Sequence, residues 1–462
     1  MQKLVIKGQF MAVQPCEIEL RRFLLLIGEQ ASGKSTIAKL IYFFQTLPDA
    51  IYESIVSANG KDVVNLKTSI GKKFSELFGG ATSGYSGQVK PDGRIYEIIF
   101  QYSDSHSLRI FATFAWIKYE IEEELENGLD LAIEKYKSSI KLRQEKVDEI
   151  NARQTLRNEL DILFNRENNE HSYLIAGRST TTAFPEIFER VVESELEKLL
   201  EEAVKEQDFE ARLRLGSERL LYEFVQWSRD VRIFFSRNGE TFSKVARSLG
   251  NHQVALSKLS TIATTVLKGE YESSQSPSIG EQIKVKSLRG GYVWIKMKDA
   301  SSGQQEVLRI LQGILLAIGL KNRREFFVIE EPEAHLYPLA QKEVVNAFAV
   351  FLNAIPQGRV VMTTHSPYIL ACVNILLLAH FVSQERGGNG IEREISEAAV
   401  PREFWLNSAD FTAYAIGHPG EYCRNIKDDV TGLVAENYLD SISEVLGMQY
   451  RQLYDLLTLA DA

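Results

Sequence analysis

The feature that most constrains the fold is residues 28–36, Gly-Glu-Gln-Ala-Ser-Gly-Lys-Ser-Thr, which fit the pattern G-x-x-x-x-G-K-[ST]. An apolar run, residues 23–27, precedes this stretch, as expected for a buried strand. An amphipathic run, residues 36–47, follows it and predicts a helix. A strand, a glycine-rich loop and a helix in this order form the context in which such a loop wraps a phosphate group.

The residue types of this loop match the groups of a nucleoside triphosphate. Its glycines let backbone N–H groups face one anion, and the helix N-terminus adds its dipole. We expect Lys34 to reach the β- and γ-phosphates and the Ser35 hydroxyl to hold Mg²⁺. The other interpretation, a chance glycine turn, is disfavoured by the complete strand, loop and helix. The expected nucleotide-binding residues are Gly28, Glu29, Gln30, Ala31, Ser32, Gly33, Lys34, Ser35 and Thr36.

Composition describes an ordinary globular chain. The 462 residues allow two to four domains, and 44% of them are hydrophobic and 25% charged. The net charge of −9 gives no global basic footprint for nucleic acid, although it leaves a local basic patch open. Three cysteines far apart in sequence predict neither a disulfide framework nor a zinc motif. A reducing, cytoplasmic location therefore fits best.

No segment predicts a membrane partner. The N-terminal residues 1–8 lack a signal-peptide core. The longest apolar stretch, residues 368–382, is interrupted by Asn374 and His380. It is too short and too polar to span a bilayer, so we interpret it as buried core.

The chain divides into four parts by pattern. Residues 1–116 contain the phosphate loop and several strands, including a predicted antiparallel pair at 95–100 and 108–112. Residues 117–250 are dominated by apolar positions at helical spacing, which predicts a helical insertion, in part a short antiparallel hairpin, with one short apolar strand that begins at Tyr173. Residues 251–382 return to strands that end in polar motifs. Residues 383–462 form an α/β extension.

Polar residues follow two further apolar strands. Glu330 and Glu331 come directly after residues 326–329, and His365 comes after residues 359–364. Because ligands bind at the carboxyl edge of parallel sheets, we expect these groups to lie near the phosphate loop. Glu330 would bind Mg²⁺, and Glu331 would orient the water that attacks the γ-phosphate. His365 would contact the γ-phosphate or that water.

A second anion site is predicted at Ser301, Ser302, Gly303 and Gln304, which precede an apolar helix at residues 307–320. These residues offer backbone N–H groups, hydroxyls and a helix dipole. The same serines also suit a helix N-cap, and the two interpretations are compatible.

The phosphate loop, the Ser-Ser-Gly-Gln motif, Ile-Glu-Glu-Pro-Glu-Ala-His-Leu and Thr-Thr-His-Ser-Pro stand in the order found in ABC-type ATPases. The chain resembles the branch with SMC-like, RecF-like and OLD-family proteins, over residues 1–115 and 250–380. The resemblance implies a P-loop ABC-type ATPase head: a mixed α/β sheet with flanking helices, an antiparallel β subdomain and a helical or short coiled-coil insertion. It also implies a head-to-tail dimer around two ATP molecules with Mg²⁺. Lys34 of one subunit would share a nucleotide with Ser301 and Gly303 of the other.

Several positions depart from the family pattern. Glu330 stands where the family usually has Asp, and Gln30 stands where it often has Asn. The Ser-Ser-Gly-Gln motif occupies the place of the family's signature motif and reads Ala-Ser-Ser-Gly-Gln here rather than Leu-Ser-Gly-Gly-Gln. Gln88 and Gln101 are candidates for the lid glutamine, and Phe10 is the suggested adenine-stacking residue.

Residues 383–462 show no Toprim-like nuclease pattern, because no Asp-x-Asp ends an apolar strand there. The chain therefore resembles stand-alone OLD-like ATPases, such as those of the PARIS and Septu anti-phage systems. That resemblance implies a dimer or higher oligomer that works with a separately encoded nuclease. The alternative is a RecF- or SMC-like DNA-binding ATPase in repair. A membrane transporter's ATPase is disfavoured by the long insertion.

Overall fold

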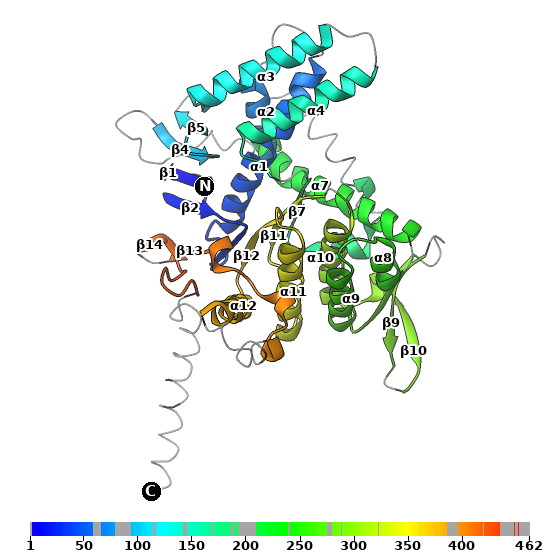
Figure 1. Ribbon diagram of the computed structural model, residues 1–462. Coiled ribbons are helices and arrows are strands. Elements are labelled where there is room, and N and C mark those ends of the chain that lie inside the picture. Colours follow the sequence, from blue (N-terminus) through cyan, green and yellow to red (C-terminus); the bar gives the residue numbers. More distant parts are fainter. Residues whose placement is uncertain are drawn as a thin grey trace.

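The structure is a computed structural model (Figure 1). It describes residues 2–58, 66–78, 94–113, 117–141, 146–167, 170–185, 189–191, 194, 209–238, 241–274, 280–287, 289–321, 323–385, 394, 397–418, 420–434, 448 and 451. Gln88 lies outside these residues, as does most of 435–462 in the predicted α/β extension.

A six-stranded sheet forms the centre of the molecule, in the order β14-β13-β3-β12-β11-β7. Five of its strands are parallel, and β14 pairs antiparallel at one edge. The strands are β3 (Phe23–Gly28), β7 (Glu170–Leu174), β11 (Glu325–Glu330), β12 (Arg359–Thr364), β13 (Phe411–His418) and β14 (Glu421–Asn425). Every residue of β3 and β11 is buried, because both faces of the sheet are covered.

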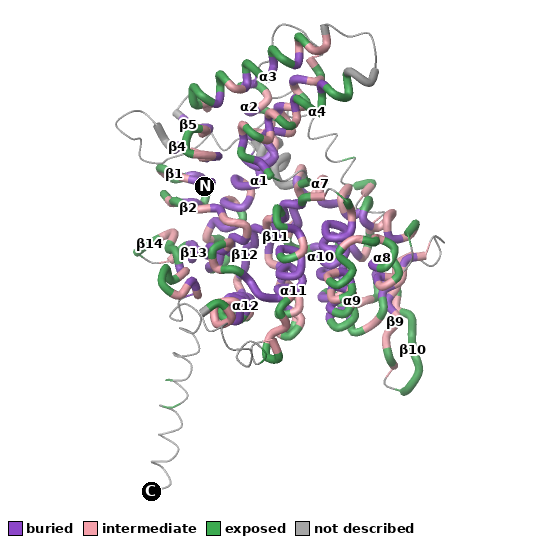
Figure 2. The backbone as a smooth tube through the Cα atoms, viewed as in Figure 1, coloured by how far each residue is buried: buried purple, intermediate pink, exposed green. Residues whose placement is uncertain are grey.

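Alternate residues of β3 face two different cores. Phe23, Leu25 and Ile27 pack with α9 (Gln253–Leu267), α10 (Ser302–Gly319), α11 (Pro338–Ala354) and α12 (Pro367–Glu385). Leu24 and Leu26 pack with α1 (Lys34–Ser57), α2 (Leu66–Phe78) and the N-terminal sheet. The period of two along the strand thus divides one apolar run between two cores. Figure 2 shows α10 and α11 as buried helices.

An antiparallel sheet forms the subdomain predicted near the N-terminus, in the order β2-β1-β4-β5-β6. Its strands are β1 (Gln2–Gly8), β2 (Cys16–Leu20), β4 (Arg94–Gln101), β5 (Ser107–Thr113) and β6 (Ile117–Ile121). The predicted pair is present as β4 and β5. Together with the central sheet and its helices, this subdomain confirms the predicted fold class.

The interval 117–250 is not one continuous helical insertion. It opens with β6, which extends the antiparallel sheet, and its middle contains β7, which pairs with β11 in the central sheet. Helices α3 (Glu123–Lys141) and α4 (Lys146–Leu163) precede β7 and lie side by side (Figure 1). Helices α5 (Arg178–Ala183), α7 (Phe209–Asn238) and α8 (Phe242–Ser248) follow it.

Strand β7 contains only part of the short strand predicted to begin at Tyr173. It starts earlier, with Glu170, His171 and Ser172, and ends at Leu174. These three polar residues interrupt the apolar pattern, so neither the start of the strand nor its place in the central sheet was predicted.

A three-stranded antiparallel sheet, β10-β9-β8, leads into α10. It comprises β8 (Gly269–Ser273), β9 (Glu281–Lys286) and β10 (Tyr292–Lys296), and the β9–β10 hairpin extends from the body of the molecule (Figure 1). Arg309 of α10 is fully buried and holds Glu281 of β9 through both guanidinium nitrogens, at 2.7 and 2.5 Å. This bidentate pair joins the small sheet to α10.

One described helix, Pro367–Gln384 within α12, is long and apolar enough to cross a membrane by length and composition. Its Ile369, Val373 and Leu377 are fully buried against the central sheet and α11. The prediction that this segment is too short and too polar to span a bilayer is therefore wrong as to length and composition, whereas its buried residues contribute to the core, as predicted.

Candidate functional site

The phosphate loop connects β3 to α1 in a conformation that needs its glycines. Gly33 is the N-cap of α1 with φ of 98°, and no side chain caps the helix. A Cβ on Gly28 would lie 2.1 Å from the Ile416 carbonyl oxygen, and one on Gly33 would lie 2.5 Å from the Tyr422 hydroxyl. The first N–H groups of α1 are therefore left without a side-chain partner, which suits an anion.

Lys34 is buried inside the curl of the loop. Its ammonium donates hydrogen bonds to the carbonyl oxygens of Gly28 at 3.0 Å and Glu29 at 2.6 Å, and to Ser32 Oγ at 3.2 Å. Burial lowers the pKa of Lys34, and the negative charges of Glu331 and Glu333 oppose that shift. The carboxylates that follow β11 thus act electrostatically on the lysine of the phosphate loop. Ser35, next to it, is exposed.

Glu331 and His365 meet at the carboxyl edge of the central sheet. His365 Nε2 lies 2.9 Å from Glu331 Oε1, and both side chains are partly exposed. Glu331 adopts a positive φ of 43°, which turns the chain at the end of β11, and its N–H donates to the Thr363 carbonyl oxygen. Such a left-handed turn is uncommon for a residue other than glycine. The sequence placed these residues on neighbouring strands, and the structure brings them together.

Glu333 fixes the backbone of the histidine turn. Its Oε1 accepts hydrogen bonds from Thr364 Oγ1 and from the backbone N–H of His365, each at 2.7 Å. Its Oε2 is buried and has no hydrogen-bond partner within the described part of the chain. The carboxylate therefore holds His365 in place from the loop that follows β11.

Glu330, the predicted metal ligand, forms hydrogen bonds with residues in and just after β7. Its Oε1 accepts a hydrogen bond from the Tyr173 hydroxyl at 2.7 Å, and its Oε2 accepts one from the Ala176 N–H at 3.3 Å. Burial, followed by the neighbouring Glu330 charge, raises the pKa of Tyr173 well above its ordinary value, so the phenol stays a donor. In this arrangement Glu330 holds the end of β7, and its role in binding Mg²⁺ stays a prediction.

Arg178 is a residue whose importance the sequence did not indicate. It is fully buried, and its guanidinium donates to the carbonyl oxygens of Ile175, Glu330 and Glu331. Its Nε lies 3.2 Å from Glu306 Oε2. Desolvation lowers the pKa of Arg178, and Glu306 opposes that shift most strongly. No local sequence pattern indicates which carbonyl groups surround this arginine, because they come from the end of β11, from the residue just after it and from the turn after β7.

Glu306 completes the same network from α10. Its carboxylate accepts the backbone N–H groups of Arg178 and Ser179, each at 3.0 Å, and it is fully buried. One carboxylate thus joins the helix that follows the Ser-Ser-Gly-Gln motif to the ends of β7 and β11.

The Ser-Ser-Gly-Gln motif begins α10 with a capping box. Ser301 Oγ accepts the N–H of Gln304, and the Gln304 side chain accepts the N–H of Ser301. A Cβ on Gly303 would lie 2.6 Å from the His335 carbonyl oxygen, so the helix start packs tightly against the loop after β11. Ser301 and Ser302 are exposed. The structure therefore shows the N-cap and leaves both serines accessible to a second molecule.

Two residues suggested for the nucleotide lie elsewhere. Phe10 is fully buried among Phe74, Phe78 and Tyr96, with ring centroids 6.0, 5.5 and 4.9 Å away, so the suggestion that it stacks on adenine is wrong. Gln101 ends β4, where it pairs with Lys3 and Ser107 in the antiparallel sheet. That sheet is separate from the one whose edge carries the phosphate loop.

A cavity of about 490 Å³ flanks the phosphate loop instead. Residues 29–32 line one side, and Gly417, His418, Gly420 and Tyr422 of the β13–β14 turn line the other. The Tyr422 hydroxyl donates to the Ser32 carbonyl oxygen at 2.7 Å and ties the two sides together. These two residues are 390 positions apart in sequence, and no motif marks the turn.

The site offers oxygen ligands of the kind that Mg²⁺ prefers. Ser35 contributes an exposed hydroxyl, and the Glu331 carboxylate is partly exposed. Among the described residues, no group of three or more His, Cys, Asp or Glu side chains is arranged to hold a metal by itself. The residues therefore fit a Mg²⁺ ion that takes most of its ligands from phosphates and water.

Comparison with solved structures finds SMC and RecF proteins, with low identity and low TM-scores. The SMC head domain from Thermotoga maritima is 11% identical with a TM-score of 0.34, and the match covers 80% of this chain and 90% of that one. An Smc head with an extended coiled coil, bound to the C-terminal domain of ScpA from Pyrococcus furiosus, is 14% identical with a TM-score of 0.38, over 80% and 92%. The recombination mediator RecF is 10% identical with a TM-score of 0.28, over 79% and 92%.

No curated protein matches the chain. The profile of the AAA ATPase domain matches residues 1–370. This span contains the phosphate loop, the capped signature helix and the Glu331–His365 pair. The chain belongs to the AAA ATPase domain family.

Proposed function

We propose that the protein hydrolyses ATP with Mg²⁺ and that Glu331, His365 and Lys34 are the catalytic residues. The observation that carries this proposal is the Glu331–His365 contact of 2.9 Å at the sheet edge where the phosphate loop begins. Glu331 orients and polarises the attacking water through its free carboxylate oxygen. His365 holds Glu331 through Nε2 and stands beside the transferred phosphate. Ser35 would hold Mg²⁺ together with phosphate oxygens, and the bound ion would supply positive charge to neutralise the phosphates.

Lys34 is poised to exchange its present partners for phosphate oxygens. Its three hydrogen bonds run to two carbonyl oxygens and one hydroxyl of the loop itself. A γ-phosphate offers charged acceptors, which form shorter and stronger bonds with an ammonium. Binding of ATP therefore satisfies the lysine more fully than the loop does.

Ser301, Ser302, Gly303 and Gln304 act, in this proposal, on the nucleotide of a second subunit. The two serines are exposed at the start of α10, where N–H groups and the helix dipole attract an anion. The family resemblance supports a head-to-tail dimer in which each site uses both subunits. ATP then favours the dimer, because the closed form makes contacts that the open form lacks.

For the biological output we propose that the ATP-driven dimer organises a separately encoded effector, a nuclease, in anti-phage defence in the cytoplasm. The resemblance of the motifs to stand-alone OLD-like ATPases supports this role. The alternative is a RecF- or SMC-like ATPase that binds nucleic acid directly. One specific observation favours it: the β9–β10 hairpin has a basic and aromatic face with exposed Lys286, Tyr292 and Trp294.

The first prediction concerns Glu331→Gln. The amide keeps the size of the side chain but loses the charge that polarises water, so phosphate release should fall about 100-fold or more while ATP binding persists. Phosphate release and equilibrium binding of a fluorescent ATP analogue measure the two effects. Glu149→Gln, an exposed change on α4, is the matched control and should leave both unchanged. Normal turnover by the Glu331→Gln protein would remove this residue from the mechanism.

The second prediction tests the composite site by mixing two inactive proteins. Lys34→Ala disables the phosphate loop, and Ser301→Arg blocks the signature with a bulky charge. In a mixed dimer one of the two sites keeps an intact loop and an intact signature. An equimolar mixture should therefore recover about a quarter of the wild-type rate if subunits exchange freely. Activity that stays at the level of the separate variants would show that each site lies within one chain.

The third prediction concerns Arg178→Lys. An ammonium cannot reach the carbonyl oxygens of Glu330 and Glu331 while it also holds Glu306, because it lacks the planar fork of a guanidinium. Glu331 should lose its fixed position, and turnover should fall about 10- to 100-fold. Arg309→Lys is the control, since Arg309 is another fully buried arginine that pairs with a glutamate. Both variants should lower the melting temperature, but only Arg178→Lys should lower turnover at a temperature where each is folded.

The fourth prediction is biological. Cells that carry this gene with a neighbouring effector gene should resist some phages, whereas the Lys34→Ala pair and this gene alone should not. Plaque counts on a diverse phage panel measure the effect. Equal counts in all strains would contradict the defence role and leave the nucleic-acid alternative.

A further inference from the structure

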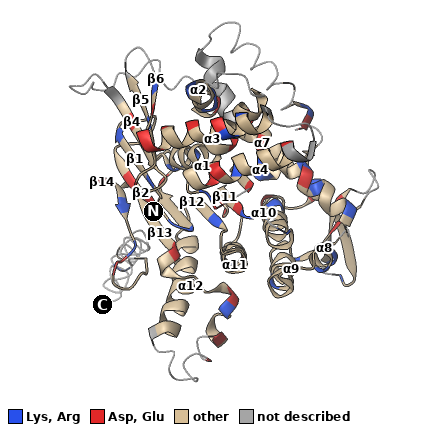
Figure 3. Ribbon diagram, turned by 45° about the horizontal axis from the view of Figure 1, so that its top comes forward, with Lys and Arg blue, Asp and Glu red and all other residues tan. Residues whose placement is uncertain are grey.

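The β9–β10 hairpin carries a concentration of positive charge that the net charge of the chain conceals. Residues 282–298 contain Lys284, Lys286, Arg289, Lys296 and Lys298 and no Asp or Glu. Lys286, Arg289, Lys296 and Lys298 are exposed. Within the described residues, neither Lys286 nor Arg289 forms an ion pair, so their charge is available to a partner. In the ribbon of Figure 3, positions of Lys and Arg are interspersed with positions of Asp and Glu on the helices around the central sheet.

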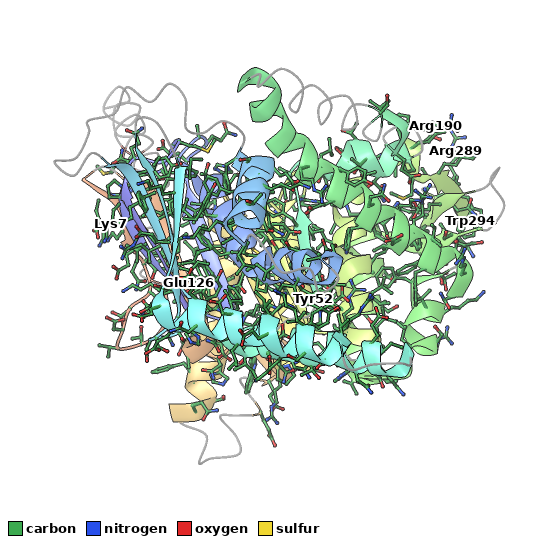
Figure 4. All side chains as sticks on the ribbon, turned by 90° about the horizontal axis from the view of Figure 1, so that it is seen from above. Lys7, Tyr52, Glu126, Arg190, Arg289 and Trp294 are labelled. Atoms are coloured by element: carbon green, nitrogen blue, oxygen red, sulfur yellow. The ribbon has the colours of Figure 1, made fainter. Side chains whose placement is uncertain are left out.

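Two large aromatic side chains share one face with these lysines. The register pairs Lys286 with Tyr292 and Lys284 with Trp294, and cross-strand partners point to the same side of a sheet. Tyr292 is 68% exposed and Trp294 is 43% exposed. Figure 2 shows β10 as exposed, and Figure 4 places Trp294 and Arg289 at the same margin of the molecule.

The two rings are held in place by the lysine between them. Lys284 Nζ lies 5.0 Å from the centroid of the Tyr292 ring and 5.5 Å from that of Trp294. Both distances fall within the range of a cation–π contact. The opposite face of β9 is anchored, since Ile283 is fully buried and Arg309 holds Glu281. The aromatic face is therefore presented on a strand pair that is anchored at the base of β9.

Protection of an edge strand does not explain this surface. Strand β10 is the outer strand of its sheet, and lysines on such strands prevent sheets from pairing edge to edge. An exposed Trp and an exposed Tyr would favour the very association that the lysines prevent. The combination of the two residue types calls for a partner.

The positive charge of this face indicates the class of molecule that it binds. Protein interfaces are enriched in Tyr and Trp but depleted in Lys, whereas this face alternates lysines with aromatic rings. Polyanions with flat rings satisfy both residue types at once, because the lysines bind phosphates and the rings stack on bases. On the inner side, the register of β8 and β9 sets Glu270 opposite Lys284 and Glu272 opposite Gln282, so the negative charge of β8 would repel a polyanion from the inner half of the sheet.

The distance between the two aromatic side chains favours single-stranded over double-stranded nucleic acid. Tyr292 and Trp294 are two residues apart on one strand, so their Cβ atoms are separated by about 7 Å. Stacked bases in a duplex strand rise only about 3.4 Å. Both rings can engage neighbouring bases only where the bases have unstacked. We propose that the Lys284, Lys286, Tyr292 and Trp294 face of the β9–β10 hairpin binds single-stranded nucleic acid, an interaction that goes beyond ATP hydrolysis and does not rest on it.

The test uses the full chain and a fluorescein-labelled thirty-nucleotide oligo-dT, with a duplex of the same length for comparison. Fluorescence anisotropy should show tighter binding to the single strand. Trp294→Ala should weaken that binding about fivefold or more, because one base then has no ring to stack on. Lys284→Gln with Lys286→Gln should make the slope of log K against log salt shallower by about 1.4, which is about 0.7 for each phosphate that is no longer neutralised. The matched control, Lys321→Gln with Lys342→Gln, removes the same charge from exposed positions outside the hairpin and should change neither quantity.

Three outcomes would overturn the proposal. The first is equal affinity of the Trp294→Ala and wild-type proteins for the single strand. The second is no binding by the wild-type protein at low salt. The third is loss of ATP-dependent self-association in Trp294→Ala with unchanged oligo-dT binding, which would assign this face to a second subunit. ATP hydrolysis by Trp294→Ala without nucleic acid should equal that of wild type. Loss of oligo-dT binding with normal hydrolysis, or the reverse, therefore separates this proposal from that of the ATPase.

Discussion

The parallel register of β3, β12 and β11 is the constraint on which the site depends. Thr363 pairs with Leu26 on one side and with Glu330 on the other, so the three strands end in phase. Gly28, His365 and Glu331 each follow the last paired residues. A shift of one residue in either pairing would reverse which side chains face each core, and both faces are packed. The apolar fit of the strands therefore fixes the relative height of the phosphate loop, the histidine and the glutamate.

A buried charge network fixes the lateral position of the turn that carries Glu331. Arg178 and Glu306 are both fully buried in the low dielectric of the interior, where desolvation of either ion alone costs about several kcal/mol. The cost is offset because Arg178 also donates to three carbonyl oxygens and Glu306 accepts two backbone N–H groups. An apolar pair of the same volume would pack as well but could not satisfy the backbone groups at the ends of β7 and β11. The ions are thus retained for geometry at the turn that carries Glu331.

The features that could be predicted from the sequence are those that local sequence patterns encode. The phosphate loop, the Glu331 turn and His365 were predictable because each follows an apolar run that is buried on both faces. The capping box at Ser301 was predictable because Ser followed three residues later by Gln is a local signal. The full extent of β7 was not predictable, since its pairing with β11 depends on tertiary contacts and its first residues are polar. The inward turn of Glu330 and the burial of Phe10 likewise depend on partners distant in sequence, Tyr173 and Tyr96.

Helix α10 connects parts of the molecule that lie apart in the sequence. Ser301 and Gln304 cap its first turn, Glu306 holds the end of β7, and Arg309 holds β9. These contacts all occur in the first half of one buried helix, so displacement of the hairpin relative to Glu306 would break a buried ion pair. Breaking such a pair costs about 3–5 kcal/mol, which is more than the coupling energy of about 1–3 kcal/mol that a ligand typically supplies. The capped start of α10, the turn that carries Glu331 and the base of the β9–β10 hairpin are therefore joined through the first half of one buried helix.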